Sequence, residues 1–209
     1  MSTSPRSTAG GFLLAALITS TMIVAPAATA AAEAPLPDTT APGLSVSITP
    51  VATGLNGWYR EPVTFTVVAV DDTDPAPVVL ASVDDDELTP SPGSFVVTGD
   101  GVHTVMIRAV DASGNGGKII VRTIRIDNTA PTVAAARTGD HRLALSATDA
   151  TSGVASIEYR YVLTVRNRSY PTGWRSYTAP IPAFGGRLIT VEYRATDVAG
   201  TTSQVGVFR

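Results

Sequence analysis

Apolar and polar residues alternate with a period of two over several stretches of the chain. Residues 44–49 alternate aliphatic side chains with Ser and Thr, and residues 104–109 repeat the pattern with Val105, Ile107 and Ala109 on one face. Between them, Val63 and Phe65 share a face with positions 67 and 69. This spacing is typical of β-strands with one buried face, and Gly, Pro, Asp and Asn cluster between the stretches. No window shows the apolar face of a capped helix, so the pattern predicts an all-β fold.

Three sequence matches occur twice in the same order. Residues 38–42 (DTTAP) return as 127–131 (DNTAP), residues 68–71 (VAVD) correspond to 146–149 (SATD), and residues 108–114 (RAVDASG) correspond to 194–200 (RATDVAG). Two copies are too few for a solenoid, but each is long enough for about seven short strands. The repeat therefore predicts two tandem β-sandwiches, at 38–127 and 128–209, after a linker at 31–37.

Several motifs of these copies resemble bacterial immunoglobulin-like repeats. They are the DxTAP opening, NGWY at 56–59 before PVT at 62–64, SGVASIEYR at 152–160, Trp174 with Tyr177, and YRATD at 193–197. The resemblance covers nearly all of the chain after residue 37 and implies two immunoglobulin-like sandwiches of an exported or cell-surface protein. Such modules act mostly as spacers, adhesive surfaces or carbohydrate binders, and are often appended to exoenzymes.

The first thirty residues have the pattern of a secretory signal peptide. Arg6 is the only charged residue before Glu33, and an apolar core at 12–24 precedes the small-residue motif Ala28-Thr29-Ala30. This order is typical of a cleavable signal, and the core is shorter than the ~20 residues that span a bilayer. We expect cleavage after Ala30, a secreted protein that is also a candidate for association with the cell envelope, and no membrane span in the mature form.

The amino-acid composition excludes several kinds of functional site and partner. The chain has no Cys, which excludes disulfides, thiol catalysis and Cys-ligated zinc. The first copy carries 12 acidic and 5 basic residues, and the second carries 5 acidic and 9 basic residues. The two copies thus differ in the sign of their charge, but the second copy lacks any nucleic-acid-reading motif, so we expect no nucleic-acid partner.

Catalytic motifs are absent from the sequence. There is no nucleophile elbow, no phosphate-binding Gly loop and no His-rich metal spacing. His141 lies in a predicted turn. His103 lies where many immunoglobulin-like domains place a corner Tyr that bonds back to the backbone, and it has no His counterpart in the second copy. The sequence therefore predicts a non-catalytic protein without a catalytic residue set.

Acidic and amide side chains near the boundary between the copies form a candidate calcium site. In an immunoglobulin-like sandwich, the N-terminus and two of the loops share one pole, and the preceding domain ends beside it. Oxygen ligands from several loops are what Ca²⁺ requires, although short Asp side chains also stabilise turns by themselves. The candidate ligands at this interdomain junction are Glu61, Asp100, Asp127, Asn128, Asp149 and Asp197.

The second copy also offers aromatic and arginine side chains for ligand binding. Aromatic rings stack on sugars and Arg binds carboxylate or phosphate in a bidentate way, although aromatic residues of a fold motif also pack in cores. The candidate residues are Tyr159, Tyr161, Arg166, Arg168, Trp174, Arg175 and Tyr177.

These features support an exported, non-catalytic adhesive or binding module at or near the cell envelope. A glycan or an anionic cell-envelope polymer is the candidate ligand, and another exported protein is a further candidate partner. The alternatives are a structural spacer or accessory subunit of a secreted enzyme, and a more remote one is an unrecognised hydrolase.

Overall fold

The computed structural model describes residues 36–85, 87–139, 141–184 and 188–209. The predicted signal peptide at 1–30 lies outside these residues, as does most of the predicted linker. Within the described ranges every regular element is a β-strand, as the alternating pattern predicted. None of the described segments forms a helix long and apolar enough to cross a membrane. Residues from Pro37 to Arg209 pack as one compact unit that contains two β-sandwiches.

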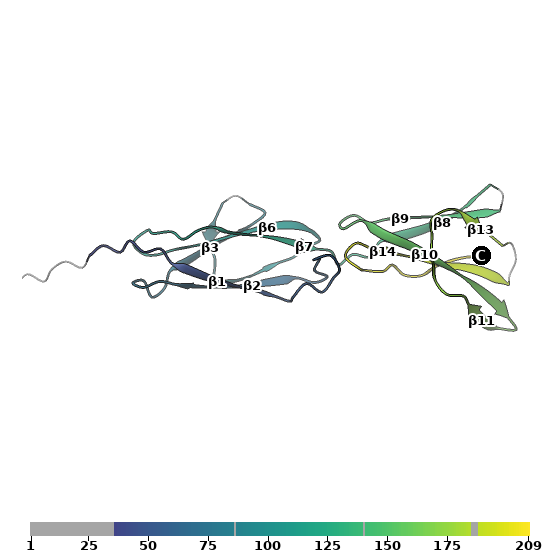
Figure 1. Cartoon of the computed structure of the whole chain (residues 1–209), viewed down its shortest axis with the longest axis horizontal. Helices are drawn as coiled ribbons and strands as arrows, with labels where there is room; N and C mark the ends of the chain where they lie inside the picture. The colour runs from purple at the N-terminus through teal and green to yellow at the C-terminus, as the bar shows by residue number, and fades with distance from the viewer. Residues whose placement is uncertain (1–35, 86, 140, 185–187) are drawn as a thin grey trace, which may run out of the picture. The chain divides into compact units, whose positions relative to one another are not determined.

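The first sandwich consists of a three-stranded and a four-stranded antiparallel sheet (Figure 1). The three-stranded sheet has the order β1-β2-β5, with β1 at Gly43–Thr49, β2 at Val63–Val70 and β5 at Ser94–Val97. The four-stranded sheet has the order β4-β3-β6-β7, with β4 at Thr89–Pro90, β3 at Val78–Val83, β6 at Gly101–Val110 and β7 at Ile120–Ile126.

The core of the first sandwich lies between these sheets and follows the predicted alternation. Val63 and Phe65 of β2 and Val105 and Ile107 of β6 are completely buried. The ring of Phe65 stacks on Phe95 of β5 with centroids 5.1 Å apart. Because successive strand residues point to opposite faces, the same period-two pattern that identified the strands also identifies the core.

The second sandwich consists of a three-stranded and a five-stranded antiparallel sheet. Its three-stranded sheet has the order β13-β9-β8, with β13 at Ile181–Pro182, β9 at Arg142–Thr148 and β8 at Thr132–Thr138. The other sheet has the order β11-β10-β14-β15, with β11 at Arg168–Pro171, β10 at Val154–Val165, β14 at Ile189–Asp197 and β15 at Gly206–Phe208. The short strand β12 at Arg175–Ser176 also pairs with β10.

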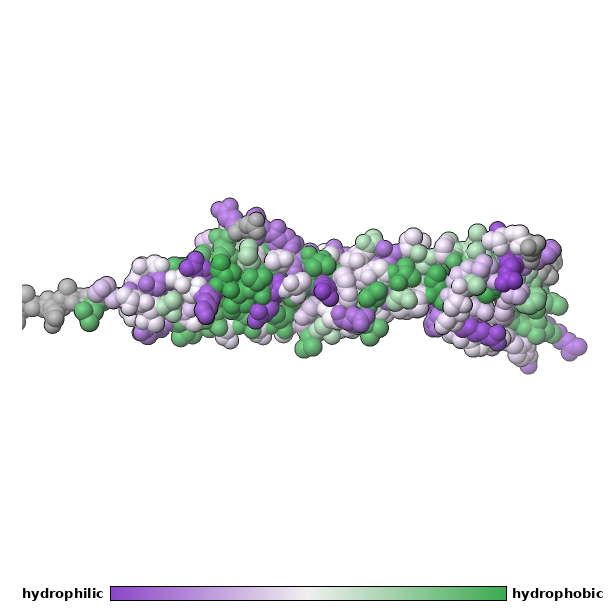
Figure 2. Space-filling model, turned by 45° about the horizontal axis from the view of Figure 1, so that its top comes forward, coloured by the Kyte–Doolittle hydropathy of each residue, from purple (hydrophilic) through white to green (hydrophobic). Residues whose placement is uncertain are grey.

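The core of the second sandwich is more aromatic than that of the first. Leu143, Leu145, Ile181 and Val191 are its buried centre. Four half-buried tyrosines pack around it, namely Tyr159, Tyr161, Tyr177 and Tyr193. Large apolar side chains are also exposed in both sandwiches, and Figure 2 shows them as green areas between polar ones.

Candidate functional sites

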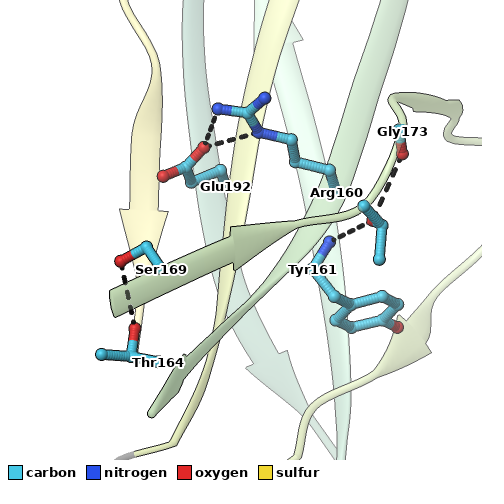
Figure 3. A network of polar contacts seen from close by, with 7 residues as sticks. Arg160, Tyr161, Thr164, Ser169, Gly173 and Glu192 are labelled. Carbon is cyan, nitrogen blue, oxygen red and sulfur yellow. Dashed lines mark hydrogen bonds and ion pairs between the residues drawn. The ribbon is translucent and has the colours of Figure 1, made fainter. Parts of the chain in front are cut away.

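The outer face of the five-stranded sheet in the second sandwich carries two crossed ion pairs. Strands β10 and β14 contain the same tripeptide, Glu-Tyr-Arg, and their antiparallel register places Tyr159 opposite Tyr193. Each Glu therefore faces an Arg of the other strand. Figure 3 shows the ion pair between Arg160 and Glu192. The Arg160 guanidinium lies 2.6 Å from the Glu192 carboxylate, and that of Arg194 lies 2.8 Å from the Glu158 carboxylate.

Trp174 covers these ion pairs. The guanidinium carbons of Arg160 and Arg194 lie 4.6 Å and 4.2 Å from the centre of its ring, within the range of cation–π attraction. Trp174, a predicted binding residue, is half-buried against charged groups of the outer sheet face and is not part of the core. The guanidinium groups hold the indole ring in place.

A groove of about 800 Å³ continues along the same face. Its polar lining includes the hydroxyls of Thr164, Ser169 and Thr190 and the guanidiniums of Arg137 and Arg209. The Thr164 and Ser169 hydroxyl oxygens are 3.4 Å apart across β10 and β11 (Figure 3). Glu192 also lines the groove.

The groove and Trp174 belong to one continuous surface, which we call the outer-face groove. Glu192 lines the groove and binds Arg160, which in turn contacts the indole ring. The charge of Arg137 and Arg209 is available to a ligand, because neither forms an ion pair with another described residue. The Arg137 guanidinium lies 5.0 Å from the centre of the Phe208 ring, which orients it.

The predicted aromatic and arginine residues do not form one surface. Tyr159, Tyr161 and Tyr177 pack against the core, and the Tyr161 hydroxyl donates to the Pro182 carbonyl at 3.1 Å. Burial and the neighbouring Tyr159 raise the pKa of Tyr161, against the opposing charges of Arg175 and Arg142.

The three predicted arginines are exposed, but they do not line the groove. Arg166 lies in the turn between β10 and β11 with a φ of 48°. Arg168 pairs with Val165, so strand alternation directs it to the face opposite Thr164 and Ser169. Arg175 pairs with Tyr159 through β12.

Of the residues on the outer-face groove, Trp174 was predicted from the sequence and the residues that line the groove itself were not. The repeated Glu-Tyr-Arg tripeptide was a usable signal, because two copies on paired antiparallel strands bring opposite charges together. Arg137 and Arg209 had no such signal, since Arg137 lies on β8 and Arg209 follows β15, and only the fold brings both to the groove.

The candidate calcium ligands separate into two groups. Asp127, Asp149 and Asp197 form an aspartate cluster in which a carboxylate oxygen of each lies within 4.8 Å of the other two. Asp127 and Asp197 are completely buried, and Asp149 is half-buried. Their positions follow from the fold: Asp127 follows β7, Asp149 follows β9 and Asp197 ends β14. A further group, Asp38, Asp71 and Asp72, lies at the corresponding end of the first copy.

The other predicted ligands are not part of that cluster. Asp100 accepts hydrogen bonds from the Asn128 amide nitrogen at 2.9 Å and from the Thr129 hydroxyl, so both of its oxygens fix the segment after β7. Asn128 and Glu61 are exposed. The fold thus brings three of the predicted ligands together, whereas Asp100 has a structural role in the segment that joins the copies.

His103 bonds back to the backbone as predicted for a corner residue. Its Nε2 lies 3.0 Å from the Gly99 carbonyl oxygen, four residues upstream. Its Nδ1 lies 2.6 Å from the Asp84 carboxylate, which also accepts from the Thr104 amide at 2.7 Å. The side chain therefore holds a corner of the first sandwich.

No protein-family model matches the chain, and no curated protein sequence matches it either. Among solved structures, the fibronectin(III)-like modules of Clostridium thermocellum CbhA are similar at 15% identity, covering 78% of this chain and 91% of that one, with a TM-score of 0.37. The D00–D0 domain of intimin is similar at 14% identity, covering 79% and 99%, with a TM-score of 0.39. The sheets themselves define the fold class, which is a tandem pair of immunoglobulin-like β-sandwiches.

Proposed function

We propose that this protein is an exported, non-catalytic binding module whose second sandwich binds an acidic polysaccharide of the cell envelope along the outer-face groove. The observation that carries the proposal is the combination of Arg137 and Arg209, free of described ion pairs, with three hydroxyl side chains in one groove. Arg pairs with carboxylates in a bidentate way, and hydroxyls exchange hydrogen bonds with sugar hydroxyls.

The rigidity of the surface supports the same function. Most of its side chains lie on paired strands, so binding requires little loop ordering and loses little conformational entropy. Val162, at the floor of the groove, is 5% exposed, which gives the polar side chains an apolar base. Trp174 adds a ring beside the groove, because it contacts Arg160, the ion-pair partner of the groove residue Glu192, and this suits a chain of several sugar units.

The second part of the proposal is that the protein is exported. The predicted signal peptide supports this part. The Arg6 start, the apolar core and Ala28-Thr29-Ala30 indicate secretion and cleavage after Ala30. An exported module with a charged groove would meet envelope or extracellular polymers before other macromolecules. N-terminal sequencing of the secreted protein tests export and cleavage, and the sequence should begin at Ala31.

Affinity electrophoresis through gels containing polygalacturonate, with dextran as the neutral control, tests the binding function. Polygalacturonate should retard the wild-type mature protein more than dextran does. Arg137→Ala and Trp174→Ala should each weaken retardation by about fivefold or more, in line with the loss of one charged or aromatic contact. The matched control is Arg168→Ala, which removes an Arg from the face of the β10–β11 hairpin opposite Thr164 and Ser169 and should leave retardation unchanged.

Two results would contradict the proposed function. Equal weakening by Arg168→Ala and Arg137→Ala would mean that only net charge matters. Absence of retardation by any polymer tested, with both sandwiches folded by circular dichroism, would favour the spacer or accessory subunit.

A further inference from the structure

The aspartate cluster of Asp127, Asp149 and Asp197 has more negative charge than its surroundings neutralise. Two of its three carboxylates are completely buried, and no described Lys, Arg or His forms an ion pair with any of them. Taking unpaired carboxylates out of water is strongly unfavourable, so they are normally paired or coordinate a metal. The cluster therefore requires a positive partner or a bound proton.

Local backbone contacts hold the three carboxylates in place. The Asp127 carboxylate accepts from the amides of Thr129 at 3.2 Å and Ser152 at 3.1 Å. One oxygen of Asp149 accepts from the amides of Thr151 at 3.1 Å and Gly153 at 2.7 Å. The arrangement is therefore preformed by the segment after β7 and the loop after β9.

Asp197 supplies the observation that distinguishes this cluster from ordinary turn-forming Asp residues. Its Oδ1 accepts from the Thr201 amide at 2.7 Å, whereas its Oδ2 is buried and has no hydrogen-bond partner. The Thr201 hydroxyl is also buried without a partner. Burial raises the pKa of Asp197, and the negative charges of Asp127 and Asp149 raise it further against the Thr201 and Gly200 amides.

In the first copy a side chain satisfies the aspartate that corresponds to Asp197, although Asp38 and Asp71 there each have a buried Oδ2 without a partner. Asp111 corresponds to Asp197, and Asn115 corresponds to Thr201. The Asn115 backbone amide donates to Asp111 Oδ1 at 2.7 Å, and its side-chain amide donates to Asp111 Oδ2 at 2.8 Å. That side-chain amide also donates to the Asp38 carbonyl at 3.1 Å, which joins the start of the copy to this turn. In the second copy the Thr201 backbone amide makes the first of these bonds, but the Thr201 side chain has no amide to make the other two.

We propose that a Ca²⁺ ion occupies the aspartate cluster and serves the second copy as the Asn115 amide serves the first. Two ligands of one Ca²⁺ at about 2.4 Å can be at most about 4.8 Å apart, which the three carboxylates satisfy. Ca²⁺ accepts the irregular geometry of ligands from three separate segments more readily than Mg²⁺ does. The ion binds the orphan oxygen of Asp197 and ties the start of the second sandwich to its two adjacent loops.

Thr201→Asn is the most direct test, because it installs the amide that the first copy uses. In the wild-type mature protein freed of metal, 5 mM CaCl₂ should raise the melting temperature by about 5 °C or more relative to EDTA, since the ion binds only the folded state. Thr201→Asn should melt higher than the wild type in EDTA and should lose most of the calcium shift. Isothermal titration calorimetry should show at least tenfold weaker calcium binding in Asp197→Asn.

Asp100→Asn is the matched control, since it removes an acidic residue next to the cluster without removing one of its members. It should retain the wild-type calcium shift. An unchanged shift in both Thr201→Asn and Asp197→Asn would overturn the site, as would no shift in the wild type. An equal response to MgCl₂ would overturn the assignment to calcium. The experiment contains no polysaccharide, so its failure is distinct from failure of the proposed binding function.

Discussion

The imidazole of His103 is held between Asp84 and the Gly99 carbonyl, with Nδ1 2.6 Å from the Asp84 carboxylate and Nε2 3.0 Å from the carbonyl oxygen. Both partners are acceptors, so both ring nitrogens must carry a proton when the two bonds are formed. Burial by itself lowers the pKa of His103, but the bonds to Asp84 and Gly99 and the charge of Asp84 outweigh it, so the pKa is raised. The same contact, with the Thr104 amide, lowers the pKa of Asp84.

This pair should make the stability of the first sandwich depend on pH. A raised His pKa stabilises the fold below about 6.5, and the contribution is lost as pH rises through the folded-state pKa. A lowered Asp pKa stabilises the fold above about 3.8, and that contribution is lost as pH falls through the folded-state pKa. In urea unfolding followed by Trp58 fluorescence, His103→Gln should thus lower the free energy of unfolding more at pH 5.5 than at pH 8.5. Asp84→Asn should remove the same pH dependence, and an equal loss at both pH values would contradict the charged pair.

Asp100 should stabilise the segment between the copies without any metal. Its carboxylate accepts from the Asn128 amide and the Thr129 hydroxyl. Asp100→Ala leaves these donors to water and should cost about 1–2 kcal/mol of unfolding free energy. The loss should be the same in EDTA and in calcium, as measured by urea denaturation. A loss that disappears in EDTA would place Asp100 among the metal ligands instead.

Asn115→Thr should reproduce in the first copy the orphaned oxygen found in the second. It removes the side-chain donor that satisfies Asp111 Oδ2 and the Asp38 carbonyl. Leaving a buried acceptor unsatisfied costs about 1–3 kcal/mol, so the first sandwich should lose that much stability. The comparison is Asn128→Thr, because Asn128 is exposed and its side chain makes no hydrogen bond with described residues. A loss below about 0.5 kcal/mol in Asn115→Thr would show that water replaces the amide.

The ion pair between Arg160 and Glu192 should contribute modestly to stability. The two side chains are 28% and 22% exposed, which leaves them partly screened by solvent. A double-mutant cycle with Arg160→Met and Glu192→Gln should give a coupling energy of about 0.5–1 kcal/mol at low salt, and less in 0.5 M NaCl. The same cycle in Trp174→Ala should give a smaller value, because the indole ring holds Arg160 near Glu192. A coupling energy independent of Trp174 would contradict that positioning role.

The sequence was a good guide to the strands and the core because both depend on local alternation. Phe65 and Ile107 lie on strictly alternating strands, and both are buried as predicted. The corner bond of His103 was also predictable, since it spans only four residues. These features depend on contacts within one strand or one turn.

The surface of the second sandwich was harder to predict because it depends on pairing between distant strands. Trp174 and Arg168 are close in sequence, yet Arg168 faces away from the groove, whereas Trp174 contacts Arg160 and Arg194. A register shift between Val154 and Ser156 decides which residues of β10 face β14. Asp197 also looked like an ordinary turn residue, because only the structure shows that its Oδ2 lacks the partner that Asn115 provides in the first copy.

The two Glu-Tyr-Arg tripeptides also protect the chain against misalignment while it folds. A slip of one residue between β10 and β14 would turn core side chains outward, which burial already opposes. A slip of two residues keeps every side chain on its proper face, but it sets Glu158 opposite Glu192 or Arg160 opposite Arg194. Like charges directly opposite destabilise a sheet, so either shifted pairing is penalised. The side chains of Glu158, Arg160, Glu192 and Arg194 therefore also favour the native register of β10 and β14, the two longest strands of the second sandwich.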